Sequence, residues 1–102
     1  MLTSKQRAKL KSVGANTDAL YQMGKNETGE NYIIQINAAL DAKELVKIKI
    51  LENALYTAKE AALMLAERTD GETVQVIGSK VLLYRKSRKP DKRELSKIID
   101  GI

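Results

Sequence analysis

Cysteine and histidine are both absent from this chain of 102 residues. Without cysteine the chain can form no disulfide, no thiolate nucleophile and no zinc site built from thiolates. Without histidine it lacks the usual general base near neutral pH and the commonest transition-metal ligand. No acidic cluster stands out for magnesium, and nothing resembles a paired acid and base or a phosphate-cradling loop of nucleotide hydrolases. We therefore expect a protein that is not an enzyme and that uses no cofactor and no metal.

Large aromatic side chains and long apolar runs are also scarce. The chain has no Phe and no Trp, and we expect its four tyrosines, Tyr21, Tyr32, Tyr56 and Tyr84, to be buried or half-buried rather than exposed as stacking platforms. No apolar segment of a signal peptide follows the N-terminus, and no run approaches the roughly 20 residues of a membrane span. We expect a soluble, cytoplasmic protein with no membrane partner.

Positive charge is abundant and unevenly distributed. The net charge is +5 and the isoelectric point is near 9.5, which suggests a polyanionic partner. Residues 51–78 are predominantly acidic, whereas basic residues crowd the two ends of the chain. Near the N-terminus these are Lys5, Arg7, Lys9 and Lys11; near the C-terminus they are Lys80, Arg85, Lys86, Arg88, Lys89, Lys92, Arg93 and Lys97. Such polarisation is what a binding face requires.

The spacing of apolar residues predicts the element order αβαβαββ. Capping boxes at Thr3–Gln6 and Thr57–Glu60 predict the starts of the first and third helices. The segment Leu45–Leu51 alternates apolar and basic residues with a period of two, as a strand does, and Gly78-Ser79 predicts a hairpin with a type II′ turn. The predicted helices cover 3 to about 14, 30–43 and 57–68, and the predicted strands cover 19–23, 45–51, 73–77 and 80–85.

This order indicates an α/β fold with a four-stranded mixed sheet and packed helices. The domain is expected to cover residues 1–86. Residues 87–102 form a basic C-terminal tail, in which Pro90 is placed to start a short helix with Leu95, Ile98, Ile99 and Ile102 on its apolar side. A frayed tail is the alternative.

A polar loop between the first strand and the second helix is the first candidate site. Gly24 permits close approach of another backbone, Lys25 adds a mobile charge, and the following helix N-terminus favours an anion. Together with Asn26, these residues suit a phosphate group. The plain alternative is a polar connector with no ligand.

Several ordered segments resemble one family. They are Leu2–Arg7, Gln22–Asn26, Leu45–Ile50, Val74–Gly78 and Val81–Arg85. On these residues, from 1 to about 86, the chain resembles the YhbY-type CRM domain family of RNA-binding proteins. The resemblance implies a fold similar to the C-terminal domain of bacterial translation initiation factor three. It also implies association with precursors of the large ribosomal subunit.

The family's loop is a GxxG sequence, similar to the loop with which KH domains clamp a nucleic-acid backbone. Gly24, Lys25 and Asn26 match it, but Glu27 stands where the second glycine is expected. Gly29 stands where the family tends to have a helix-capping Thr, a role that Thr28 is placed to take. Either Glu27 points away from the phosphate, or the loop is looser and binds RNA less tightly.

We expect RNA contacts from the basic stretches and the loop: Lys5, Arg7, Lys9, Lys11, Gly24, Lys25, Asn26, Lys47, Lys49, Arg85, Lys86, Arg88 and Lys89. For each stretch there is an alternative without RNA, namely a solvated helix face, a solubilised strand face or a soluble tail. The predicted function is a monomer that binds structured ribosomal RNA of large-subunit precursors and assists ribosome assembly, with no small-molecule substrate. The alternative is a module that binds ribosomal proteins or assembly factors.

Overall fold

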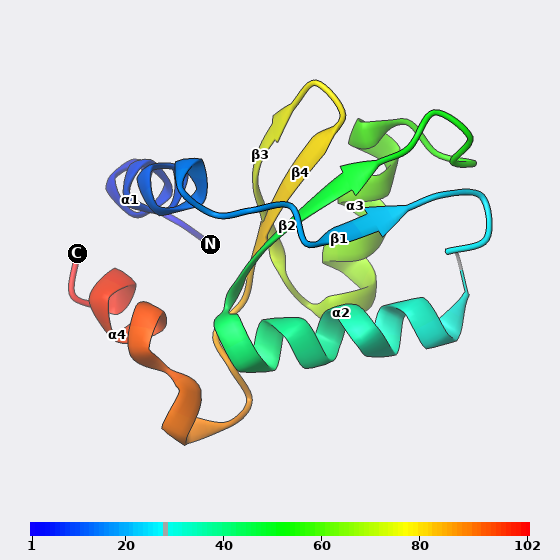
Figure 1. Cartoon of the computed structure of the whole chain (residues 1–102). Helices are drawn as coiled ribbons and strands as arrows, with labels where there is room; N and C mark the ends of the chain where they lie inside the picture. The colour runs from blue at the N-terminus through cyan, green and yellow to red at the C-terminus, as the bar shows by residue number, and fades with distance from the viewer. Residues whose placement is uncertain (28) are drawn as a thin grey trace.

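The structure, a computed structural model, describes residues 1–27 and 29–102. The predicted cap Thr28 lies outside these residues. Within these described residues, four helices, one short 3₁₀ turn and four strands follow one another (Figure 1). They are α1 (Ser4–Ala15), β1 (Tyr21–Met23), α2 (Glu30–Lys43), β2 (Leu45–Ile50), α3 (Ala58–Thr69), β3 (Glu72–Ile77), β4 (Lys80–Tyr84), η1 (Pro90–Lys92) and α4 (Glu94–Asp100). The predicted order through β4 is confirmed, although β1 starts two residues later than predicted.

Local signals in the sequence account for the helix ends. The Thr3 and Thr57 side chains accept hydrogen bonds from the third residues of α1 and α3, and Gln6 and Glu60 reciprocate, so both predicted capping boxes are present. Asp70 ends α3 in the left-handed conformation, with φ of 58°. At the hairpin Gly78 has φ of 55° while Ser79 does not have a positive φ, as the predicted type II′ turn requires.

The sheet has the strand order β1-β2-β4-β3. β1 runs parallel to β2, and the other neighbouring pairs are antiparallel, which confirms the predicted mixed sheet. A shift of register between Thr73 and Gln75 puts a bulge at Val74 in the edge strand β3.

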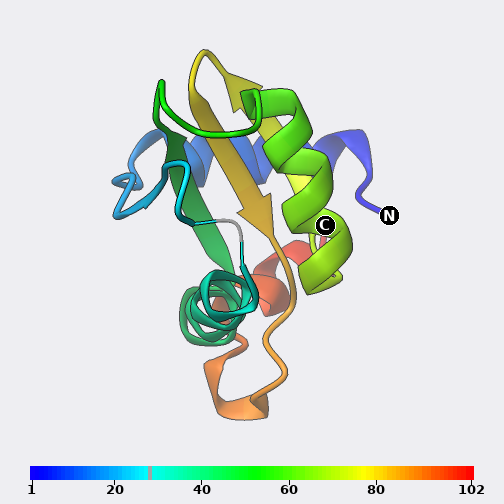
Figure 2. The same ribbon diagram turned by 90° about the vertical axis from the view of Figure 1, so that its right-hand side faces the viewer.

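Helices cover both faces of the sheet. α2 and α3 pack on one face, whereas α1 and α4 lie on the other (Figures 1 and 2). The first layer buries Ile36, Leu40, Ile48, Leu65 and Leu83 in the larger core cluster. A smaller cluster under α1 and α4 contains Leu10, Leu45, Val74, Leu82, Tyr84 and Ile99. Tyr32 and Tyr84 are buried, and Tyr21 and Tyr56 are half-buried, as predicted.

The segment after β4 is a fixed part of this second layer. Of the two alternatives for residues 87–102, the structure has the short helix, because Ile99 and Ser96 of α4 are buried. Gln6 of α1 donates a hydrogen bond to the Ile99 carbonyl oxygen over 3.0 Å. Ile98 and Ile102 are exposed, so the predicted apolar side of α4 is only partly used.

Candidate nucleic-acid interface

Strand pairing arranges the side chains on the α1 side of the sheet in rows. Pairing of neighbouring strands aligns Gln22, Lys49, Lys80 and Ile77 in one row, and Lys47, Leu82 and Gln75 in the next. Because side chains alternate between the two faces of a strand, these residues share one face. The row of Leu45 and Tyr84 lies beneath α1 and α4, and the row of Lys49 and Lys80 is exposed.

Two contacts explain why α1 covers only half of this face. Arg7 donates hydrogen bonds to the carbonyl oxygens of Thr73 and Val74, over 2.7 and 2.9 Å, at the bulge of β3. At the other end of α1, Gly14 lies directly against Leu82, where an added Cβ would overlap the leucine methyl groups. The helix is therefore held close to the sheet and ends one residue after Gly14, at Ala15, leaving the rest of the face uncovered.

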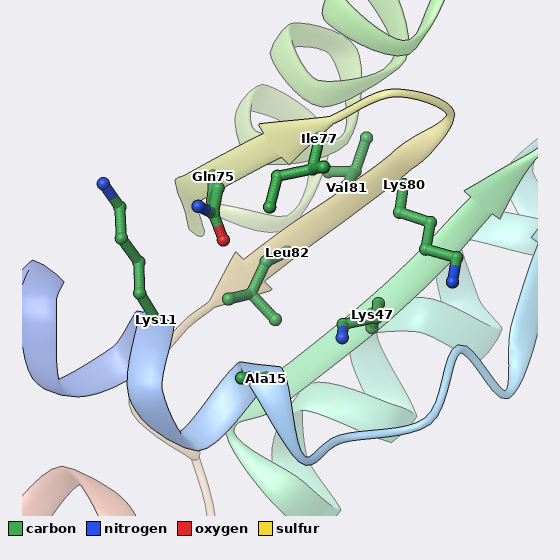
Figure 3. A pocket seen from close by; sticks show the side chains of 9 residues that line it. Lys11, Ala15, Lys47, Gln75, Ile77, Lys80, Val81 and Leu82 are labelled. Atoms are coloured by element: carbon green, nitrogen blue, oxygen red, sulfur yellow. The ribbon is translucent and has the colours of Figure 1, made fainter.

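A cavity of about 360 Å³ occupies the angle between the last turn of α1 and the uncovered strands (Figure 3). Its walls come from three elements besides α1, namely β2, β4 and β3. The lining residues are Lys11, Gly14, Ala15, Lys47, Gln75, Ile77, Lys80, Val81 and Leu82. The cavity thus combines ammonium groups at its rim with aliphatic side chains and an amide.

We call Lys11, Lys47, Lys49 and Lys80 the basic sheet face. Lys49 and Lys80 stand directly opposite each other in the register of β2 and β4. Like charges opposite one another destabilise a sheet, and none of these four lysines forms an ion pair within residues 1–27 and 29–102. A bound anion would relieve this repulsion.

The other lysines of α1 point elsewhere. An α-helix turns by about 100° per residue, so Lys9 lies about 200° around the helix from Lys11. Lys5 and Lys9 are exposed, but they lie on the flank away from the cavity. Arg7 is held by the β3 carbonyl groups. Of the predicted N-terminal cluster, only Lys11 lies at the cavity.

The loop at Gly24 is closed by its own glutamate. The Gly24 N–H donates to Glu27 Oε2 over 3.1 Å, and the Glu27 N–H donates to the Gly24 carbonyl oxygen over 3.3 Å. Gly24 is buried, and a Cβ there would lie 3.2 Å from Asn53 Oδ1. The glycine is therefore needed for packing within the protein. Glu27 thus turns back into the loop and occupies the Gly24 N–H.

The same loop lies at the end of the sheet that carries Lys49 and Lys80. The N–H of Leu51 donates to the Met23 carbonyl oxygen, and that of Ile50 donates to the Ser79 carbonyl oxygen, over 2.9 and 2.7 Å. These bonds bring the ends of β1 and β2 together with the hairpin turn. Lys25 and Asn26 are exposed at this end, where Lys25 adds a further positive charge and Asn26 a neutral amide.

The predicted basic arm lies at the opposite end of the sheet and is held by Asp41 of α2. Arg85 donates to Asp41 Oδ1 over 2.6 Å and Arg88 donates to Asp41 Oδ2 over 2.7 Å. The Arg88 hydrogen bonds and the two positive charges lower the pKa of Asp41 to about 2. The Arg85 side chain is only 10% exposed and also contacts Asn37 and Thr69. Its guanidinium is therefore used within the protein.

A second buried carboxylate fixes the chain after Arg85. Glu44, fully buried and left-handed with φ of 67°, accepts hydrogen bonds from the N–H groups of Ser87 and Ser96 over 2.7 and 2.9 Å. Lys86 pairs with Asp100 over 2.6 Å, and Lys89 is exposed. The stretch from Arg85 to Lys89 thus anchors the C-terminal segment to the rest of the fold, and it lies away from the basic sheet face.

Of the nine residues that line the cavity, the sequence predicted only Lys11 and Lys47 as site residues. It did not select the other seven: Gly14, Ala15, Gln75, Ile77, Lys80, Val81 and Leu82. Lys80 was visible in the C-terminal charge run, and it follows the predicted hairpin. What the sequence did not reveal is the strand order, which places β4 between β2 and β3 and sets Lys80 beside Lys49.

Within residues 1–27 and 29–102, no helix has the length and apolar character needed to cross a membrane. In the same part of the chain, no group of three or more acidic side chains is placed to hold a metal ion.

Comparison with known proteins agrees with the sequence resemblance. The model of the CRS1 / YhbY (CRM) domain matches residues 2–85. The chain is 35% identical over 95 residues to the "Probable RNA-binding protein YqeI" of Bacillus subtilis, covering 93% of this chain and 99% of that protein. A Pseudomonas aeruginosa protein, "Probable RNA-binding protein PA4753", is 31% identical over 94 residues, with 89% and 88% covered.

A solved structure shows the same fold. The solution structure of the hypothetical Staphylococcus aureus protein SAV1595, described as a candidate RNA-binding protein, superposes with a TM-score of 0.73. The two chains are 42% identical, and the match covers 92% of this chain and 98% of the other. With the family model matched from residue 2 to residue 85, the chain belongs to the CRS1 / YhbY (CRM) domain family.

Proposed function

We propose that this protein binds structured RNA by its phosphate groups, through the basic sheet face. The observation that carries the proposal is the pair of opposed lysines, Lys49 and Lys80, which have no acidic partner in the part of the chain that the structure describes. Lys47 and Lys11 add two charges from a strand and a helix that pack around the same cavity. Phosphate contacts of this kind supply most of the sequence-independent affinity of proteins for nucleic acids.

The relatives support RNA as the polyanion, since they are named as RNA-binding proteins. The scarcity of exposed aromatic side chains favours recognition of RNA shape over stacking along a single strand. We further propose, from the family resemblance, that the RNA is ribosomal RNA in precursors of the large subunit. In this proposal the protein acts as a cytoplasmic monomer that assists assembly without catalysing a reaction.

A pair of charge-matched variants tests the RNA contact. The first replaces the basic sheet face: Lys11, Lys47, Lys49 and Lys80 each become Gln. The second replaces four exposed lysines elsewhere: Lys43, Lys59, Lys92 and Lys97 each become Gln. Both variants lower the net charge from +5 to +1 (5 − 4 = 1), so any difference between them reports position rather than total charge.

The assay is the affinity for a structured ribosomal RNA fragment, measured against salt concentration. Each phosphate contact contributes about −0.7 to −0.9 to the slope of log K against log salt. For the first variant, the slope of log K against log salt should be shallower by about three, because four phosphate contacts are lost. For the second variant, the slope should stay close to that of the unsubstituted protein. Equal losses in both variants would show that the positive charge acts without a defined face, and a flat response in the unsubstituted protein would remove phosphate binding altogether.

The assembly role needs a separate test in cells. A tagged copy of the protein should sediment with large-subunit precursors, and treatment with RNase before sedimentation should release it. If the protein stays with the precursor after RNase treatment, a ribosomal protein or assembly factor holds it, and the alternative of a protein-interaction module is correct.

A further inference from the structure

The cavity beside the basic sheet face contains more than phosphate binding requires. Its floor and edge are aliphatic, formed by Leu82, Ile77 and Ala15. Ile77 is 62% exposed and lies in the same cavity lining as Lys80 and Lys11, so a ligand held by these lysines would also meet an apolar surface. A phosphate group binds cations and hydrogen-bond donors, and it gains nothing from contact with aliphatic side chains. The lysines therefore account for only half of the cavity's chemistry.

The aliphatic side chains and the Gln75 amide of the cavity suit a flat, partly polar group. Gln75 and Ile77 project from the same side of β3, and Leu82 points from β4 toward the end of α1 (Figure 3). A Gln side-chain amide both accepts and donates hydrogen bonds, so it can pair with the edge of a nucleobase. The volume of about 360 Å³ falls within the range of small-ligand sites.

We propose that this cavity receives one unpaired nucleobase of the bound RNA. The inference rests on the proposed function, because RNA is the polyanion that the basic sheet face would hold. The base lies against Ile77 and Leu82, its edge meets Gln75, and the ammonium groups of Lys11, Lys47 and Lys80 contact the phosphates on either side.

The occupant has to be an unpaired base, because a base within an A-form helix stays stacked between its neighbours and shows only its edge in the minor groove. A bulge or internal loop presents a base that can leave the stack at a small cost. The protein should therefore select helical RNA that carries such an irregularity. This preference would give specificity to an interface that otherwise recognises only the charge and the shape of the RNA.

Three RNA hairpins with the same stem sequence distinguish binding of the base from binding of the RNA backbone. One is fully paired, one carries a single bulged adenosine, and one carries an abasic bulge at the same position. The bulged adenosine should bind about tenfold more tightly than the other two, because only it offers a base to the aliphatic side chains and the Gln75 amide. The abasic RNA controls for the flexibility that a bulge gives to the helix.

Variants locate the preference on the protein. Ile77→Ala removes the exposed platform, and Ala15→Leu fills the cavity from the last turn of α1. Each should abolish the preference for adenosine and leave the affinity for the paired hairpin unchanged. Leu63→Ala is the matched control, since Leu63 is 72% exposed on α3, in the opposite layer, and it should keep the preference.

The outcomes distinguish this inference from the proposed function. If all three RNAs bind equally and with a steep salt dependence, phosphate binding stands and the base cavity is refuted. If the adenosine preference survives in both Ile77→Ala and Ala15→Leu, the base binds elsewhere and the inference is equally refuted. If none of the RNAs binds, the proposed function and the inference fall together.

Discussion

Replacing Asp41 by Asn tests whether Arg85 and Arg88 serve the fold. Asp41 is 9% exposed and accepts hydrogen bonds from both guanidinium groups and from the Arg88 N–H. The drop of its pKa from 3.8 to about 2 corresponds to about 2 kcal/mol of stabilisation. Asp41→Asn also leaves the buried Arg85 guanidinium without a counter-charge, and breaking a buried pair in this way costs up to about 3–5 kcal/mol. We expect a loss of about 3 kcal/mol.

Arg88→Gln provides the contrast. The Arg88 hydrogen bonds are the largest cause of the lowered pKa of Asp41, but the Arg88 side chain is 62% exposed, so solvent screens this pair and it contributes about 0–1 kcal/mol to stability. Arg88→Gln also leaves Asp41 paired with the buried Arg85. Urea unfolding followed by circular dichroism should therefore show a large loss for Asp41→Asn and a loss of 1 kcal/mol or less for Arg88→Gln. Equal small losses for the two variants would refute the assignment of Asp41 as the residue that holds the C-terminal segment.

The same carboxylate predicts a pH dependence. Because the folded-state pKa of Asp41 is depressed, its contribution is fully present above the unfolded value of 3.8 and is lost as the pH falls toward about 2. The free energy of unfolding should decline over this window in the unsubstituted protein. The decline should be smaller in Asp41→Asn, and an unchanged decline would assign the acid sensitivity to other carboxylates.

Two further predictions concern Gly14 of α1 and Glu27, which accepts a hydrogen bond from the Gly24 N–H. Gly14→Ala should destabilise the protein by about 1 kcal/mol in urea unfolding, because overpacking against Leu82 exceeds the gain in helix propensity; a more stable variant would mean that Leu82 moves aside freely. Glu27→Gly should strengthen RNA binding, because it removes a negative charge and frees the Gly24 N–H. Glu27→Gln keeps an acceptor for that N–H, so it separates the two effects, and unchanged or weaker binding in Glu27→Gly would show that the loop does not clamp the RNA backbone.

Local signals in the sequence were sufficient to predict the helices and strands as far as β4, whereas they left the helix α4 open against a frayed tail. The capping boxes at Thr3 and Thr57, the period-two alternation around Ile48 and the Gly78-Ser79 turn each depend on a few neighbouring residues. Such patterns act through short-range backbone geometry and survive in the folded chain.

Contacts between distant segments could not be read in the same way. The pairing of Asp41 with Arg85 and Arg88 spans more than forty residues, and nothing in the local sequence distinguishes these arginines from free basic residues. Strand order likewise decides that Lys80 meets Lys49, and the packing of α1 on the sheet decides that Lys11 lies at the cavity. The predicted site therefore contained cations that the fold uses internally, and it omitted Lys80.

Photochemical crosslinking in cells, followed by identification of the crosslinked peptides, shows directly whether RNA binds at the basic sheet face. RNA should be attached to peptides that contain residues 45–50 and 75–82, and also to peptides that contain the 24–26 loop. Crosslinks confined to the outer surfaces of α2 and α3, or to the segment after Arg85, would contradict it.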